Sequence, residues 1–87
     1  MSEKTEYELS THAAMVMAER EIPEEWVARV PSNPERAARD ASDPALLHAL
    51  GRIPERDDRV LRVVYNETTH PYRIVTAYFD RAMRDQR

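Results

Sequence analysis

Two strand-forming segments joined by a short loop constrain this chain more than any other feature. Residues 59–66 and 72–79 are rich in Val, Ile, Tyr and Thr, side chains that pack well on a pleated surface. The five-residue connection, Glu67–Pro71, predicts an antiparallel hairpin. Two arginines, Arg62 and Arg73, lie among these apolar residues. A fold built on this hairpin must cover one of its faces and give each arginine either a partner or solvent.

Pairing Asn66 with Tyr72 sorts the hairpin side chains onto two faces. One face is apolar and is expected to be core, with Leu61, Val63, Val75, Ala77 and Phe79. The other mixes aliphatic, aromatic and arginine side chains, with Val60, Arg62, Val64, Tyr72, Ile74, Thr76 and Tyr78. Such a mixture is typical of an interface. This mixed face either contacts RNA or a partner, or is covered by the C-terminal tail, by residues 35–39 or by a second copy. A shift of one residue in the pairing would re-sort both sets.

The residues before the hairpin predict two helices and further strands. Ser10 or Thr11 can cap a helix that ends near Arg20. Pro23 opens a second helix, whose apolar side includes Trp26, and Pro31 ends it. A short edge strand is expected near residues 35–39 and a longer strand at 46–53. We therefore predict an α+β fold, in which two N-terminal helices pack on a three- to four-stranded antiparallel sheet.

A chain of 87 residues makes one domain, 1–87. Within it we expect a flexible tail at 1–9, the helical pair at 10–31, the sheet at 32–80 and a polar tail at 81–87. The acidic N-terminus does not look like a signal peptide, and the longest apolar run, Ala13–Ala18, is too short to cross a bilayer. These features predict a cytoplasmic protein without membrane contact.

The composition excludes several classes of site. There is no cysteine and no histidine or acidic motif with metal-ligand spacing, so neither a disulfide nor a metal site is expected. One glycine cannot form a glycine-rich phosphate loop, and no cofactor is expected. The net charge is −3, which does not describe a strongly cationic nucleic-acid binder, so any RNA contact must be local.

Histidine and arginine supply the candidate chemistry. A pair of histidines near an arginine can cleave RNA without a metal, because one takes the proton of a 2′-hydroxyl, the other protonates the leaving oxygen, and arginine stabilises the charged phosphate. The candidates are His12, His48 and Arg62, whereas His70 lies in the hairpin loop. The simpler alternative is that each histidine hydrogen-bonds a neighbouring group.

Three stretches carry a resemblance to a known family: THAAMVMAEREIPEEWV, HALGRIPERDDRVLRVVYN and PYRIVTAYFDRAMR. Over roughly Leu9–Arg84 the chain resembles the small bacterial family labelled domain of unknown function 4258. Shared features are a His-Ala opening to a helix, an LRVVYN strand and a VTAYFDR-like strand. The family is similar to the BrnT and RelE-like toxins. The resemblance therefore implies their compact α+β fold, ribonuclease activity and a small neighbouring antitoxin.

The family pattern covers His12, Glu19, Arg20, His48, Arg59, Arg62, Tyr65, Thr76 and Asp80. It marks these as shared positions, although this acidic chain departs from the toxins in charge. The first functional hypothesis is a toxin-like, metal-independent endoribonuclease or translation inhibitor. The second is a non-catalytic module that binds a partner or dimerises through the mixed face. For contact with RNA or a partner we expect Arg20, Arg59, Tyr65, Tyr72, Thr76 and Tyr78. Possible partners are an antitoxin or other small protein, RNA, or a second copy.

Overall fold

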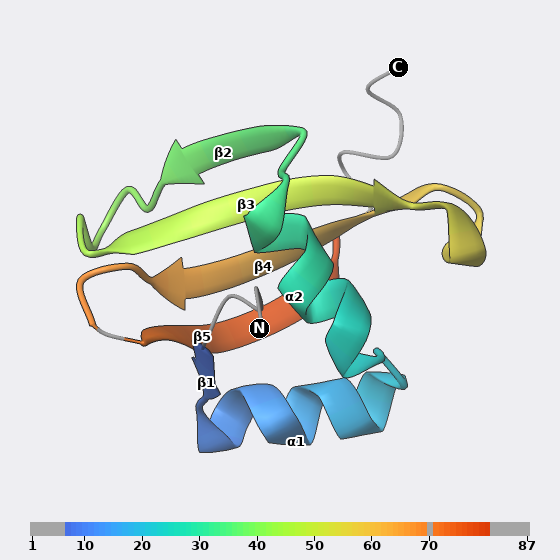
Figure 1. Cartoon of the computed structure of the whole chain (residues 1–87), viewed down its shortest axis with the longest axis horizontal. Coiled ribbons are helices and arrows are strands. Elements are labelled where there is room, and N and C mark those ends of the chain that lie inside the picture. Colours follow the sequence, from blue (N-terminus) through green and yellow to red (C-terminus); the bar gives the residue numbers. More distant parts are fainter. Residues whose placement is uncertain (1–6, 70, 81–87) are drawn as a thin grey trace, which may run out of the picture.

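The predicted hairpin lies within the sheet of the computed structural model of the protein, which describes residues 7–69 and 71–80 (Figure 1). In that part of the chain there are two helices, five strands and one short 3₁₀ turn. Their bounds are β1 Tyr7–Leu9, α1 Thr11–Arg20, α2 Glu24–Ser32, β2 Arg36–Arg39, β3 Leu46–Ile53, the 3₁₀ turn Pro54–Arg56, β4 Arg59–Asn66 and β5 Tyr72–Phe79. The ranges predicted for the first helix and for the three long strands are confirmed. The predicted tail at 81–87, and the first six residues of the tail at 1–9, lie outside the described residues.

The fold is α+β as predicted, but the sheet is larger than expected and it is mixed. Over the described residues its strand order is β1-β5-β4-β3-β2. Strands β2 to β5 are antiparallel neighbours, and β1 pairs in parallel with β5. The prediction of three or four antiparallel strands is therefore corrected to five, with one parallel pair at an edge.

Strand β1 corrects the prediction that the flexible tail extends to residue 9. Three residues are too few to show a periodic pattern, so the sequence gives no local signal for this strand. Its position depends on the edge of β5, where Tyr7 pairs with Tyr72 and Leu9 with Ile74. Ser10 strengthens this attachment, because its backbone N–H donates to Ile74 O and its hydroxyl donates to Val75 O, each at a distance of 3.0 Å.

Both helices begin as the sequence predicts. Ser10 caps α1, since its Oγ accepts a hydrogen bond of 2.9 Å from the N–H of Ala13. Pro23 takes the cap position of α2. The prediction that Pro31 ends this helix is wrong, because α2 continues to Ser32 with the proline in its last turn. There the missing N–H removes a single helical bond, and the N–H of Asn33 closes the end on Arg29 O and Val30 O.

The register of the β4–β5 hairpin differs from the simple pairing of Asn66 with Tyr72. Asn66 pairs with Arg73 and Tyr65 with Ile74, but beyond a shift at Val64 and Tyr65 the partners are Val64 and Thr76. Val75 is thus the extra residue of a β-bulge. The bulge places Ile74, with no exposed surface, in the core and leaves Val75 half-buried, which corrects the predicted faces of both residues. Tyr72 moves to the core side with Ile74.

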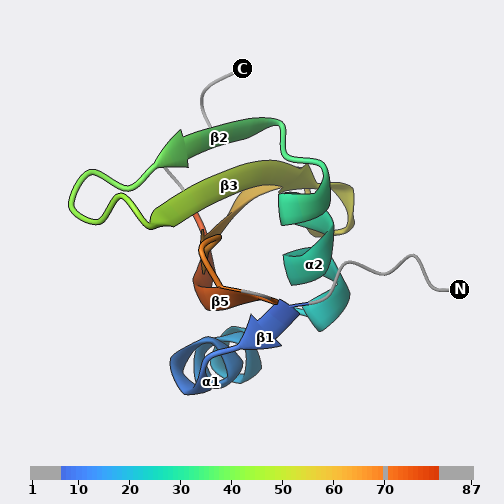
Figure 2. The same cartoon turned by 60° about the vertical axis from the view of Figure 1, so that its left-hand side comes forward.

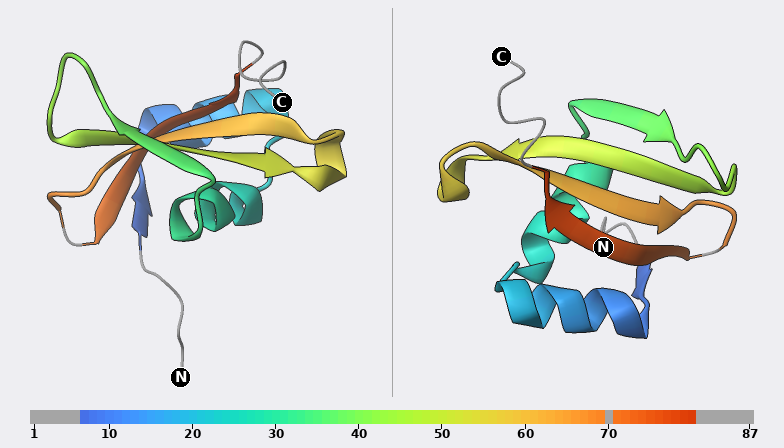
Figure 3. Two further views of the ribbon diagram at one scale, coloured as in Figure 1. Left: turned by 90° about the horizontal axis from the view of Figure 1, so that it is seen from above. Right: turned by 180° about the vertical axis from the view of Figure 1, so that it is seen from behind.

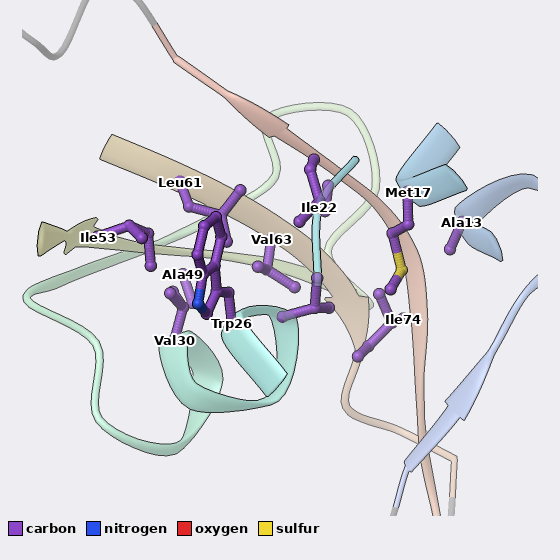
Figure 4. Close-up of a cluster of buried hydrophobic side chains, with 12 residues drawn as sticks. Ala13, Met17, Ile22, Trp26, Val30, Ala49, Ile53, Leu61, Val63 and Ile74 are labelled. Carbon is purple, nitrogen blue, oxygen red and sulfur yellow. The ribbon is translucent and has the colours of Figure 1, made fainter. Parts of the chain in front are cut away.

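One continuous core joins both helices to one face of the sheet (Figure 4). It contains Ala13, Met17, Ile22, Trp26, Val27, Val30, Ala49, Ile53, Leu61, Val63, Ile74 and Ala77. The predicted core positions Trp26, Leu61, Val63 and Ala77 are confirmed. Phe79 packs at the margin, where its ring meets that of Trp26 edge to face at 6.4 Å.

The opposite face of the sheet carries no helix among the described residues. In Figure 2, α2 lies inside the curve of the sheet, while α1 lies beside β1 and β5. From behind, in the right panel of Figure 3, β3, β4 and β5 lie in front of α2. We call this side of β3, β4 and β5 the open face; it bears His48, Leu50, Arg52, Val60, Arg62, Val64, Thr76 and Tyr78. Five of the seven residues predicted for the mixed face therefore lie on it.

The bulge makes a direct prediction about stability. Ile74→Ala should lower the free energy of unfolding by about 2–5 kcal/mol, because it leaves a cavity in the core. Val75→Ala, one residue away, should cost about 1 kcal/mol or less, because that side chain is half-exposed. Urea denaturation of both variants measures the difference. A larger loss of unfolding free energy for Val75→Ala than for Ile74→Ala would contradict the bulge and support the register without it.

Candidate functional site

Arg62 occupies the centre of the open face and is bound by two side chains of its own chain. It lies in β4, between Leu50 of β3 and Tyr78 of β5. Its Nε and Nη2 donate to the same oxygen, Oδ2 of Asp80, at distances of 2.9 Å and 2.6 Å respectively. Its Nη1 lies 2.8 Å from Nδ1 of His48. The arginine that the sequence placed on a mixed face is therefore paired within the chain.

These contacts fix the form of the His48 ring. Arginine only donates hydrogen bonds, so Nδ1 of His48 accepts from Arg62 and the ring proton lies on Nε2. That nitrogen is 2.7 Å from Oδ1 of Asp40 and donates to it. Asp40 thus orients the imidazole, as a carboxylate orients the histidine of a catalytic triad.

Asp40 is itself held in place by the turn between β2 and β3. Its Oδ2 accepts hydrogen bonds from the N–H groups of Ser42 and Asp43, each of 2.9 Å. The hydrogen bond from His48, followed by these two backbone bonds, lowers the pKa of Asp40 below its ordinary value of 3.8. The carboxylate is therefore charged at neutral pH and supports the histidine from one side.

Together the four side chains form a continuous network, Asp40–His48–Arg62–Asp80, across β3, β4 and the end of β5. The side chains of its members are only 15–24% exposed. Beside them, Leu50 and Val64 are 4% and 5% exposed although no described helix covers this face. We call Asp40, His48, Arg62 and Asp80 the open-face network. It is accessible at its surface but firmly held, a combination that suits a binding or catalytic site.

The structure unites two of the three predicted catalytic residues. His48 and Arg62 are in direct contact, whereas His12 is not part of the arrangement. His12 is exposed on α1, the helix that packs through Ala13 and Met17 on the core side of the sheet. Of the two histidine candidates, only His48 therefore contacts Arg62, and His70 lies outside the described residues.

The six predicted contact residues fall into separate places. Thr76 and Tyr78 face the same side as Arg62, because they pair with Val64 and Arg62. Arg20 is exposed at the end of α1, and the guanidinium of Arg59 lies 5.0 Å from the centre of the Phe79 ring.

Tyr65 and Tyr72 lie at the edge of the core, away from Arg62. Their ring centres are 5.1 Å apart, and the ring of Tyr7 is 5.9 Å from that of Tyr72. Burial is the main cause that raises the pKa of both the Tyr65 and Tyr72 hydroxyls. They stay neutral and pack together, so the expectation that Tyr72 shares a face with Arg62 is corrected.

The arrangement defines what the open-face network can do chemically. A histidine fixed by a carboxylate can accept or give a proton, and an adjacent guanidinium can stabilise a developing negative charge. Among the described residues, no group of three histidine or acidic side chains is arranged to hold a metal ion. None of the described helices is long and apolar enough to span a membrane.

Comparison with known proteins identifies the family. The family model described as Domain of unknown function (DUF4258) matches residues 9–79, which include His48 and Arg62. The chain belongs to this family. No curated protein and no solved structure matches it in two further comparisons. Asp80 lies one residue beyond the matched segment.

Two members of the network in this DUF4258 protein were not predicted as site residues. Asp80 is among the positions shared with the family, and its place two residues after Tyr78 puts it on the side of Arg62. Asp40 gives a weaker signal, because it follows a four-residue edge strand. Only the pairing of Ala38 with His48 brings the β2–β3 turn close to the histidine.

The lowered pKa of Asp40 predicts how this DUF4258 protein responds to acid. A carboxyl whose pKa is lower in the folded state stabilises the fold above its unfolded pKa, and that contribution is lost as the pH falls through the folded value. Asp40→Asn should therefore reduce stability at neutral pH and flatten its decline below 3.8. Urea denaturation midpoints against pH measure this effect.

Asp57→Asn, in an exposed turn, is the matched control for this measurement. The urea midpoint of both variants should still fall at low pH, because the hydrogen bonds from Arg29 lower the pKa of Glu55 to about 2. An equal slope in Asp40→Asn and in the wild type would contradict the role given to the Asp40–His48 bond.

Proposed function

We propose that this protein is a metal-independent ribonuclease of the toxin type, as the resemblance to the BrnT and RelE-like toxins implies. The contact of His48 with Arg62, with Asp40 behind the histidine, is the observation that carries the proposal. It brings a proton acceptor and a phosphate-binding group within 2.8 Å of each other on a face that no described helix covers. The α+β arrangement of two helices on one side of a sheet is in keeping with the fold that the resemblance implies.

The reaction would use the 2′-hydroxyl of RNA as the nucleophile. Its oxygen attacks the neighbouring phosphorus, and its proton passes to Nδ1 of His48. The bond from phosphorus to the 5′ oxygen then breaks, and the imidazolium returns the proton to that oxygen. The products are a 2′,3′-cyclic phosphate and a 5′-hydroxyl, so atoms and charge balance without any further reactant.

Each member of the network has a role in this reaction. Arg62 stabilises the extra negative charge on the phosphate oxygens in the transition state. Asp40 accepts a hydrogen bond from the Nε2–H of His48 and stabilises the imidazolium, which favours proton transfer to Nδ1. When a phosphate binds Arg62, the hydrogen bond that closes Nδ1 is released and the nitrogen faces the substrate.

Cleavage of RNA by the purified protein tests the proposal. The wild type should release fragments ending in a cyclic phosphate, and its expression should arrest growth. His48→Gln should lower the cleavage rate by about 10²–10⁴-fold, since it removes the acid–base group. Arg62→Ala should lower it by about 10²–10³-fold. Chelation of metals should leave the wild-type rate unchanged.

His12→Gln is the matched control, because it removes a histidine that lies outside the network. It should cleave as fast as the wild type. Absence of cleavage by the wild type together with normal growth would overturn the proposed function. Equal losses in His12→Gln and His48→Gln would place the chemistry elsewhere.

A second function is favoured by the mixed composition of the open face. Leu50 and Val64 are almost fully buried within the chain, but Val60, Arg62 and Tyr78 beside them are only half-buried and available for contact. Aliphatic, aromatic and arginine side chains together are typical of a protein interface. The open face would then bind a small partner such as an antitoxin, or a second copy, without catalysis.

Tyr78→Ala should then weaken the complex by at least about tenfold, because tyrosines at interface centres carry much of the binding energy. Sedimentation of the protein alone, and with the product of its neighbouring gene, measures the effect. Tyr7→Phe, on the far edge of the sheet, should bind normally. A monomer that binds no such partner contradicts this second function.

A further inference from the structure

We propose that the Asp80 carboxylate occupies the position on Arg62 that a phosphate group of RNA takes during binding, so that the site closes itself in the free protein. The inference rests on the proposed function, which it deepens by naming the anion site and what must leave it. Asp80 is then a competitor for the site and not a catalytic residue.

The geometry of the ion pair supports this assignment. Nε and Nη2 of Arg62 converge on a single oxygen of Asp80. These two donors form the side of the guanidinium that also receives phosphate oxygens in a fork. The Asp80 carboxylate therefore binds the edge of Arg62 best suited to a phosphate.

The third donor of Arg62 links this anion position to the histidine. Nη1 is 2.8 Å from Nδ1 of His48, so one guanidinium contacts both the anion, through Nε and Nη2, and the ring nitrogen that can take a proton. A carboxylate in this position has no proton to give to His48. An RNA phosphate brings its 2′-hydroxyl with it, and Tyr78 offers a ring beside Arg62 on which a base can stack.

Charge makes the two occupants mutually exclusive. Two anions about 4 Å apart repel strongly where solvent is partly excluded, and the side chains of Arg62 and Asp80 are only 20% and 15% exposed. The pairing of β5 with β4 at this end does not depend on the charge of Asp80, because the backbone N–H of Asp80 donates to Val60 O at 2.8 Å. The carboxylate can thus be replaced while β5 keeps its pairing.

Binding of a 2′-O-methyl oligonucleotide, which lacks the nucleophile, tests the inference without cleavage. Asp80→Asn keeps the size of the side chain and removes its charge. It should bind at least about tenfold more tightly than the wild type, measured by fluorescence anisotropy at fixed salt. Glu19→Gln, exposed on α1, changes the net charge equally and should bind like the wild type. Adding Arg62→Ala to Asp80→Asn should abolish the gain.

The outcomes separate this inference from the proposed function. If Asp80→Asn and Asp80→Ser both fold, as their circular dichroism shows, and neither binds more tightly than Glu19→Gln, the inference is overturned even where the wild type cleaves RNA. Tighter binding without cleavage by any variant supports the anion site and rejects the ribonuclease. A gain for an acidic peptide and none for the oligonucleotide overturns RNA as the ligand.

Discussion

The shift in register between β4 and β5 decides which side of the sheet each β5 side chain occupies. Val75 is the extra residue of the bulge. Alternation of side chains along β5 is therefore interrupted there: Tyr72 and Ile74 lie on the core side, whereas Thr76 and Tyr78 lie on the open face. Ile74 thereby enters the core, while Thr76 and Tyr78 remain beside Arg62. Ser10 binds the backbone at this point and fixes the start of α1 there. The bulge thus couples the attachment of the first helix to the composition of the open face.

Placing both helices on one side of the sheet has a consequence for the other side. Among the described residues, the helices pack on the core side, and the polar side chains of the open face contact one another. Arg62 would be costly to bury alone, and the open-face network meets that cost by giving it two partners. With a carboxylate at each end and a neutral imidazole, the network carries a net charge of −1, and Nδ1 of His48 is directed toward Arg62.

Membership of a family without an assigned function makes geometry the main guide to activity. The matched segment contains His48 and Arg62, and Asp80 follows it directly. A fixed histidine beside an arginine fits acid–base chemistry on a phosphate, and the same arginine already binds an anion from its own chain. The acidic character of the protein agrees with a local anion site better than with a broad basic surface.

The sequence by itself determined most of the elements and much of the core. Hydroxyl caps, prolines and strand-forming runs are local signals, so α1, β3, β4 and β5 and the core position of Trp26 could be predicted. Strand β1 and the β-bulge could not, because both depend on pairing with distant residues. The site divided in the same way: His48 and Arg62 were visible as chemistry, but their contact and the exclusion of His12 were decided by tertiary structure. Strand order and register bring Asp40, His48, Arg62 and Asp80 together, since hydrogen bonds between side chains depend on spatial neighbours and not on distance along the chain.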